Sequence, residues 1–300
     1  MTVDLSFMTL DVFSDQSFGG NPLAVYPHAE TLDAEQMQRI ALEMNYSETT
    51  FLLPPKNPAH TARVRIFTPT AELPFAGHPN VGTAWALALK PHWIPGAQDT
   101  RRMTFEQQAG VVAVDVQRDT AGDVCGCWIT PPQPYQQRHS VPRSAVADCV
   151  GLSSDRICGD GLVATVGVPF AFAEVNSRSA LAQCQPNLAA FQSCDRDYGY
   201  PEKRFSLMVY FRETQEKVHG RMFAPLIGIQ EDAATGSAAA ALAGLLAQGE
   251  AAQWVLHQGH DMGRPSTLRL RTEQVLNADL RIQVGGCCVP MIEGVLQGKV

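Results

Sequence analysis

The sequence has few charged residues and no run of basic ones. Charged residues make up 18% of the 300, and 30 acidic residues outnumber 23 basic ones, which gives a formal net charge of −7. Affinity for nucleic acid comes largely from clustered Lys and Arg that displace counterions from phosphates. Since the largest basic clusters are the pairs Arg101-Arg102 and Lys203-Arg204, we expect no nucleic acid partner.

Long hydrophobic runs are also absent. No apolar stretch reaches the roughly 18 residues of a membrane span. The start of the chain, Met1-Thr2-Val3-Asp4, carries an acidic residue before strand-like sequence, which is not the basic and then apolar pattern of a secretory leader. We therefore expect no membrane partner and a cytoplasmic protein.

Two kinds of ligand-binding motif are missing as well. No Gly-x-Gly-x-x-Gly follows a predicted strand, and Ala234-Thr-Gly-Ser237 lacks the Gly-Lys-Ser/Thr of a phosphate loop. Eight cysteines are present, but Cys125-Gly-Cys127 and the adjacent Cys287-Cys288 lack the Cys-x-x-Cys spacing of zinc sites. We predict no metal, and reduced thiols that are mostly buried.

What the sequence does contain is an internal repeat. An apolar fraction of 45% over 300 residues is typical of a globular protein of about two domains. In each half, a Phe-x-Pro segment leads through a turn into a helix of small residues. The first unit runs from Phe67-Thr-Pro69 through Gly77 to a helix over 81–89, and the second from Phe223-Ala-Pro225 through Gly236 to a helix over 238–247. This pattern predicts two similar α+β domains.

Local signals predict further elements. Asp33 followed by Gln36 predicts a helix start with a capping box, and Asn45 predicts its end. We also expect a helical stretch over about 177–192 and an exposed loop over 90–102.

Glu48 is the most conspicuous carboxylate, because it lies where a predicted helix gives way to a strand over 48–53. Burial at this transition would favour the neutral acid, as suits a general acid/base. The other interpretation is a solvated acid at the start of a strand.

The two turns before the small-residue helices hold further candidates. Helix N-termini present N–H groups that bind carboxylates, and Gly77 and Gly236 would let a ligand approach the backbone closely. His78 either carries a proton in the first turn or is a hydrogen-bonded loop histidine. Asp232 and Ser237 flank the second turn, and either line a site or cap the helix.

Five motifs, in order and over nearly the whole chain, resemble the signatures of the PhzF-like phenazine-biosynthesis family. Each is weak alone, but five in order are specific. Ala233 departs from the family pattern, which usually has Pro there, and should alter loop rigidity more than chemistry. The motifs are Ser17-Phe-Gly-Gly-Asn-Pro-Leu-Ala-Val25, Ser47-Glu-Thr-Thr-Phe51, Phe75-Ala-Gly-His-Pro79, Glu231-Asp-Ala-Ala-Thr-Gly-Ser-Ala238 and Gly259-His-Asp-Met-Gly-Arg-Pro-Ser266.

This resemblance implies an α+β protein with the diaminopimelate epimerase-like fold. Two pseudo-symmetric domains would each wrap a mixed β-sheet around a central helix, in agreement with the repeat. With the Pro-rich segment at 131–134 as the boundary, we expect domains over 1–130 and 131–285, with a strand over about 286–300 returning to the first. The active site would lie in the cleft between them, and the protein would be a homodimer.

The resemblance also implies a cofactor-independent isomerase that shifts a proton on a small carboxylic acid. The family's defining reaction is the isomerisation of trans-2,3-dihydro-3-hydroxyanthranilate. Glu48 would be the general acid/base, with His78 and Asp232 as further catalytic residues. The substrate-binding residues would be Asn21, Ser47, Gly77, Gly236 and Ser237.

Amino-acid epimerases of this fold use one cysteine from each domain to remove and return a proton on opposite faces. The corresponding turns here, over 76–78 and 232–235, contain no cysteine. A same-face proton shift by Glu48 is therefore the favoured hypothesis. The alternatives are an epimerase or racemase without the thiol pair, and a metabolite-binding protein without turnover.

Overall fold

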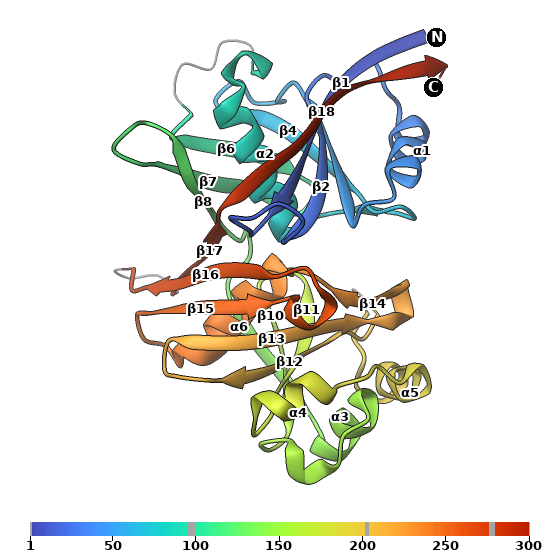
Figure 1. Ribbon diagram of the computed structural model, residues 1–300, viewed down its shortest axis with the longest axis vertical. Coiled ribbons are helices and arrows are strands. Elements are labelled where there is room, and N and C mark those ends of the chain that lie inside the picture. The colour runs from blue at the N-terminus through green and yellow to red at the C-terminus, as the bar shows by residue number, and fades with distance from the viewer. Residues whose placement is uncertain (1, 95–99, 202–203, 276–279, 300) are drawn as a thin grey trace. The chain divides into compact units, whose positions relative to one another are not determined.

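The structure is a computed structural model that describes residues 2–94, 100–201, 204–275 and 280–299 (Figure 1). The chain divides into two units. Unit 1 comprises Met1–Pro132 and Gly285–Val300, and unit 2 comprises Gln133–Val284. Each unit has its own set of paired strands and its own central helix.

Unit 1 has a mixed sheet. Strand β1 pairs antiparallel with β2 and β18, β3 pairs parallel with β2 and antiparallel with β4, and β6 pairs parallel with β4. In chain order the elements are β1 (Thr2–Val12), β2 (Asn21–Tyr26), α1 (Ala34–Met44), β3 (Glu48–Leu53), β4 (Ala62–Phe67), β5 (Glu72–Leu73), α2 (Gly77–Leu89), the 3-10 helix η1 (Pro91–Trp93), β6 (Arg102–Gln107), β7 (Gly110–Arg118), β8 (Val124–Thr130) and β18 (Cys288–Lys299).

Helix α2 is the central helix of unit 1. It contacts β1, β2, β3, β7, β8 and β18, and every residue from Gly77 to Ala88 is buried. Small residues allow this enclosure, since a Cβ at Gly82 would lie 2.5 Å from Leu23 Cδ2. Helix α1 differs in being amphipathic, and its predicted capping box with Asp33 as the N-cap is confirmed.

Unit 2 repeats the order of elements. Strand β11 pairs parallel with β12, β12 antiparallel with β13, and β13 parallel with β15, as β2, β3, β4 and β6 do in unit 1. The elements are β9 (Gln136–Val141), α3 (Arg143–Val150), η2 (Ser154–Arg156), β10 (Gly161–Thr165), β11 (Pro169–Glu174), α4 (Arg178–Gln183), α5 (Leu188–Tyr198), β12 (Leu207–Arg212), β13 (Lys217–Ala224), η3 (Pro225–Ile227), β14 (Ile229–Asp232), α6 (Gly236–Ala247), β15 (Ala252–Gln258), η4 (His260–Met262), β16 (Ser266–Glu273) and β17 (Arg281–Gly286).

The predicted internal repeat is confirmed, and it extends to individual side chains. In unit 1 the Arg65 guanidinium lies 2.7 Å from the Glu72 carboxylate. In unit 2 Arg221 lies 2.7 Å from Glu231. Each guanidinium also stacks over the Phe ring two residues later, 5.0 Å from its centroid. The two pairs differ in burial, because the Arg65 side chain is 24% exposed and the Arg221 side chain 7%.

Two helix predictions were wrong in their boundaries. Helices α2 and α6 begin at Gly77 and Gly236 rather than at 81 and 238. In α2, Pro79 fits the first helical turn, where its missing N–H costs nothing. The single helix predicted over 177–192 is two helices, α4 and α5. Pro186 separates them, and Asn187 caps the second through the N–H groups of Ala189 and Ala190.

The segment 90–102, predicted to be an exposed loop, is partly helical and partly buried. Its first residues form η1, and Trp93 and Ile94 are 9% and 8% exposed. Residues 95–99 lie outside the described part of the chain. The side chains of Trp93 and Ile94 are apolar, and their burial is favourable, which explains why this part of the segment is not exposed.

The cysteine prediction is confirmed in that all eight are free thiols and most are buried. Within the described ranges, no group of three or more His, Cys, Asp or Glu side chains is placed to hold a metal ion. The helices described here are all too short or too polar to cross a bilayer.

Candidate active site

Glu48 is the first residue of β3 and lies beside the start of β2. In this parallel pair Glu48 is opposite Leu23. The residue before it, Ser47, donates a hydrogen bond from Oγ to Asn21 Oδ1 at 2.7 Å. Asn21 is fully buried, and the Glu48 side chain is 12% exposed. The register of the sheet therefore holds the carboxylate at a largely buried position at the end of a strand.

His78, the second residue of α2, brings an imidazole to this carboxylate. Its Nε2 lies 3.2 Å from Glu48 Oε2 and has no hydrogen-bond partner among the described residues. Burial lowers the pKa of His78 to about 3, against the opposing effect of a hydrogen bond to the Pro22 backbone. Neutral His78 therefore faces Glu48 at neutral pH.

The hydrogen bond to Pro22 also fixes the tautomer of His78. Proline has no N–H, so the imidazole must donate to the Pro22 carbonyl. Since Nε2 makes no hydrogen bond to the described residues, the donor is Nδ1. Nε2 then carries no hydrogen and lies 3.2 Å from Glu48 Oε2, but the two atoms do not have the geometry of a hydrogen bond. A rotation of either side chain would be needed before a proton could pass between them.

The start of α2 offers backbone N–H groups. The N-cap residue Ala76 has no polar side chain to satisfy them, and Pro79 in the first turn has no N–H. The Asn80 side chain is used elsewhere, donating to the Ala76 carbonyl at 2.7 Å. The N–H groups of Gly77 and His78 are thus placed where a helix N-terminus binds a carboxylate.

In unit 2 a buried network holds the turn before α6. Gln258 is fully buried, and its Nε2 donates to the Asp232 carbonyl at 2.9 Å and to Thr235 Oγ1 at 3.0 Å. Its Oε1 accepts from the Thr235 N–H at 3.2 Å. Because the amide nitrogen only donates, Thr235 uses its own hydroxyl hydrogen to donate to Asp232 Oδ2 at 2.6 Å. The direction of each bond is therefore fixed.

The residues that follow begin α6 at positions equivalent to those in α2. Gly236 and Ser237 are its first and second residues, as Gly77 and His78 are in α2. Ser237 lies inside the helix and is not its N-cap. The N-cap is Thr235, whose hydroxyl points to Asp232 rather than to the helix N–H groups.

We expect Thr235→Val to lower kcat/KM about tenfold, because the isosteric methyl removes the donor that holds Asp232 Oδ2. The acid limb of the pH–rate profile should move to higher pH, since the ionised carboxylate loses a stabilising hydrogen bond. Thr235→Ser keeps the hydroxyl and should stay within about threefold of wild type. A Val variant with an unshifted profile would mean that the network is only structural.

The predicted site residues therefore form one cluster in each unit. Unit 1 brings together Asn21, Ser47, Glu48, Gly77 and His78, and unit 2 brings together Asp232, Gly236 and Ser237. Sequence analysis gave no role to Pro22, Thr235 or Gln258. The first two lie inside recognised motifs and Gln258 directly precedes one, so proximity to a motif was the available signal.

Comparisons with known proteins identify the family of the chain. The sequence matches the profile of the family described as phenazine biosynthesis-like protein over residues 10–294. The trans-2,3-dihydro-3-hydroxyanthranilate isomerase of Pseudomonas aeruginosa is 35% identical over 292 residues, covering 96% of this chain and 98% of that protein.

Solved structures confirm the predicted fold. A PhzF-family phenazine biosynthesis protein of Bacillus anthracis aligns with a TM-score of 0.84 and 21% identity, over 98% of this chain and 99% of that one. A hydroxyproline epimerase of Agrobacterium vitis, solved with bound trans-4-hydroxy-L-proline, aligns with a TM-score of 0.67 and 12% identity, over 98% and 92%.

Proposed function

Because the chain belongs to the phenazine biosynthesis-like family and is an isomerase, we propose that it moves a proton between two carbons of a small carboxylic acid without a bound cofactor. Glu48 is the general acid/base. Its carboxylate takes the proton from an acidic C–H, the electron pair delocalises over the substrate, and the same group returns the proton at the second carbon.

The observation that carries this proposal is the contact of 3.2 Å between Glu48 Oε2 and His78 Nε2. After abstraction Glu48 is a carboxylic acid, and at this distance a rotation of either side chain would let the Nε2 lone pair accept its new proton as a hydrogen bond. Ionised Glu48 offers no proton to that lone pair. The neutral imidazole therefore stabilises the state after abstraction more than the starting state, which is the requirement for lowering the barrier.

The substrate carboxylate binds at helix starts in this proposal. N–H groups near Gly77 and Gly236 hold it and oppose the developing negative charge. Asp232 and Ser237 orient the rest of the molecule and share its protons. That both units serve one substrate in a cleft between them stays a prediction, as do the homodimer and the cytoplasmic location implied by the family resemblance.

The substrate class follows from the relatives. We propose an acid similar to trans-2,3-dihydro-3-hydroxyanthranilate, after the name of the Pseudomonas isomerase. The test is deuterium incorporation from D2O into a panel of small acids that includes this compound, read by NMR and mass spectrometry. We expect deuterium at the carbon that receives the proton with wild-type protein, and none with Glu48→Ala.

Other outcomes of this experiment separate the alternatives. Deuterium at the α-carbon together with a change in optical rotation would identify an epimerase or racemase instead. Binding without exchange across the whole panel would contradict the proposed proton shift.

A further inference from the structure

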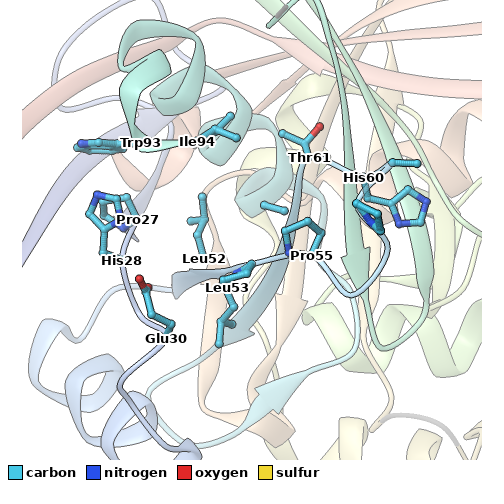
Figure 2. A pocket seen from close by; sticks show the side chains of 14 residues that line it. Pro27, His28, Glu30, Leu52, Leu53, Pro55, His60, Thr61, Trp93 and Ile94 are labelled. Atoms are coloured by element: carbon cyan, nitrogen blue, oxygen red, sulfur yellow. The ribbon is translucent and has the colours of Figure 1, made fainter. Parts of the chain in front are cut away.

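Unit 1 contains a cavity of about 560 Å³ that does not include Glu48 or His78. Its walls come from the segment after β2, the end of β3, the loop that follows β3, and η1 (Figure 2). The apolar surface is provided by Leu52, Leu53, Trp93, Ile94 and four prolines. This volume and this lining are typical of a site for a small organic molecule.

The cavity is held open by rigid elements. Pro27, Pro54, Pro55 and Pro58 lie in its walls, and each fixes its own φ. The loop after β3 is also fastened by Glu106, whose carboxylate accepts from the N–H groups of Lys56 and Asn57, both at 2.8 Å, and lies 2.9 Å from His60 Nδ1. A ligand would therefore meet a wall that is already formed, which lowers the entropic cost of binding.

The charged groups in the lining of the cavity indicate the charge of the ligand that it can bind. Glu30 is the carboxylate of the described lining, which also includes His28 and His60 but has no Lys or Arg. Figure 2 shows Trp93, His28 and Glu30 at one end of the cavity and His60 at the other. An aromatic ring and a carboxylate at the same end of the cavity, without Lys or Arg in the described lining, favour a ligand that has both an aromatic ring and a positive charge.

A second cavity of unit 1, of about 350 Å³, is lined by charged residues of both signs. Lys56, Arg63 and Arg65 contribute to its lining, together with the carboxylates of Glu72 and Glu106. The absence of Lys and Arg from the described lining of the larger cavity makes that cavity a poor site for the carboxylic acid of the proposed reaction.

We propose that the larger cavity is a binding site for a small aromatic amine, whose ring packs against Trp93 and the prolines and whose ammonium group lies at Glu30. This site is separate from the proposed active site, and its ligand carries the opposite charge from the substrate. It does not depend on the proposed isomerase mechanism.

The test uses phenethylammonium as the probe and 3-phenylpropionate as its anionic counterpart, followed by NMR of the tryptophan indole N–H signals. Trp93→Phe assigns the signal of Trp93 among the four tryptophans. We expect phenethylammonium to shift that signal with a dissociation constant on the order of 1 mM, as befits so small a ligand. 3-Phenylpropionate should bind at least tenfold more weakly.

Charge variants locate the ammonium group. Glu30 is exposed, so its substitution should not disturb folding. Glu30→Gln should weaken phenethylammonium about tenfold, and Glu30→Lys should reverse the preference toward 3-phenylpropionate. Glu35, an exposed carboxylate in the first turn of α1, provides matched controls in Glu35→Gln and Glu35→Lys, which should leave both affinities unchanged.

Three results would overturn the proposal. These are equal affinity for the two probes, equal effects of the Glu30 and Glu35 variants, and no shift of the Trp93 signal up to 20-fold above the expected dissociation constant. Isomerase turnover of Glu30→Gln should equal that of wild type, and this readout is independent of whether the cavity binds the probe.

Discussion

We expect Glu48→Gln to lower kcat about 10³-fold and to leave KM within about threefold of wild type. Gln has the shape of Glu but cannot accept a proton from carbon, and general acid/base groups contribute typically 10²–10⁴-fold. The amide can still contact His78 Nε2, which lies 3.2 Å from Glu48 Oε2 in the wild type, so the fold and the substrate site should be retained. The measurement is steady-state turnover on an acid verified by deuterium exchange.

Two further variants sharpen this result. Glu48→Asp keeps the acid but withdraws it by one methylene, and a displacement of about 1 Å should lower kcat about 10²-fold. Glu43→Gln changes an exposed carboxylate of α1 and should not alter turnover. If Glu48→Gln kept more than one tenth of wild-type kcat, another group would have to move the proton.

We expect Arg221→Ala to lower the free energy of unfolding by about 3–5 kcal/mol, because it leaves the Glu231 carboxylate, whose side chain is 12% exposed, without its cation. Besides the ion pair, Arg221 Nη1 donates to the carbonyls of Leu181, Ala182 and Cys184 at 3.1, 3.2 and 2.9 Å. These carbonyls lie at the C-terminal end of α4, and they too lose their donor. The measurement is urea denaturation followed by circular dichroism.

Unit 1 supplies the matched control for this variant. Arg65→Ala removes an ion pair of the same geometry, but the Arg65 and Glu72 side chains are 24% and 22% exposed, so water replaces the lost contacts and the cost should be about 1 kcal/mol. The double variant Arg221→Met, Glu231→Leu should recover much of the loss, since no unpaired charge stays buried. Equal effects of Arg65→Ala and Arg221→Ala would show that burial does not set the cost.

The internal repeat could be predicted from the sequence, because it consists of turn residues and small residues that recur in the same order in both halves. The sequence pattern placed the starts of α2 and α6 too late, because these helices are buried on nearly all sides and show no amphipathic period that would mark their ends. Pro186 is visible in the sequence as a helix breaker, but the helical stretch predicted over 177–192 ran through it. Trp93 and Ile94 were assigned to an exposed loop, yet both are buried and line the same cavity as Leu52 and Leu53 of β3, which lie far from them in the sequence.

The site was predictable where it depends on motif residues. Glu48 and His78 were identified from their motifs, and the structure places them in contact. The role of Gln258 could not be read from the sequence, because its partners Asp232 and Thr235 are more than 20 positions away. Likewise the tautomer of His78 depends on a carbonyl of another strand, which a motif does not encode.

The tight enclosure of α2 and α6 limits how proteins of this kind can diverge. A Cβ at Gly82 would lie 2.5 Å from Leu23 Cδ2, and one at Gly244 would lie 2.3 Å from Tyr135 Cδ2. Neither helix can turn about its axis or slide by a residue without a collision, so the first-turn N–H groups are fixed points within each unit. If these N–H groups bind the substrate carboxylate as proposed, a change of substrate is expected to come from the surrounding loops and not from the two helices.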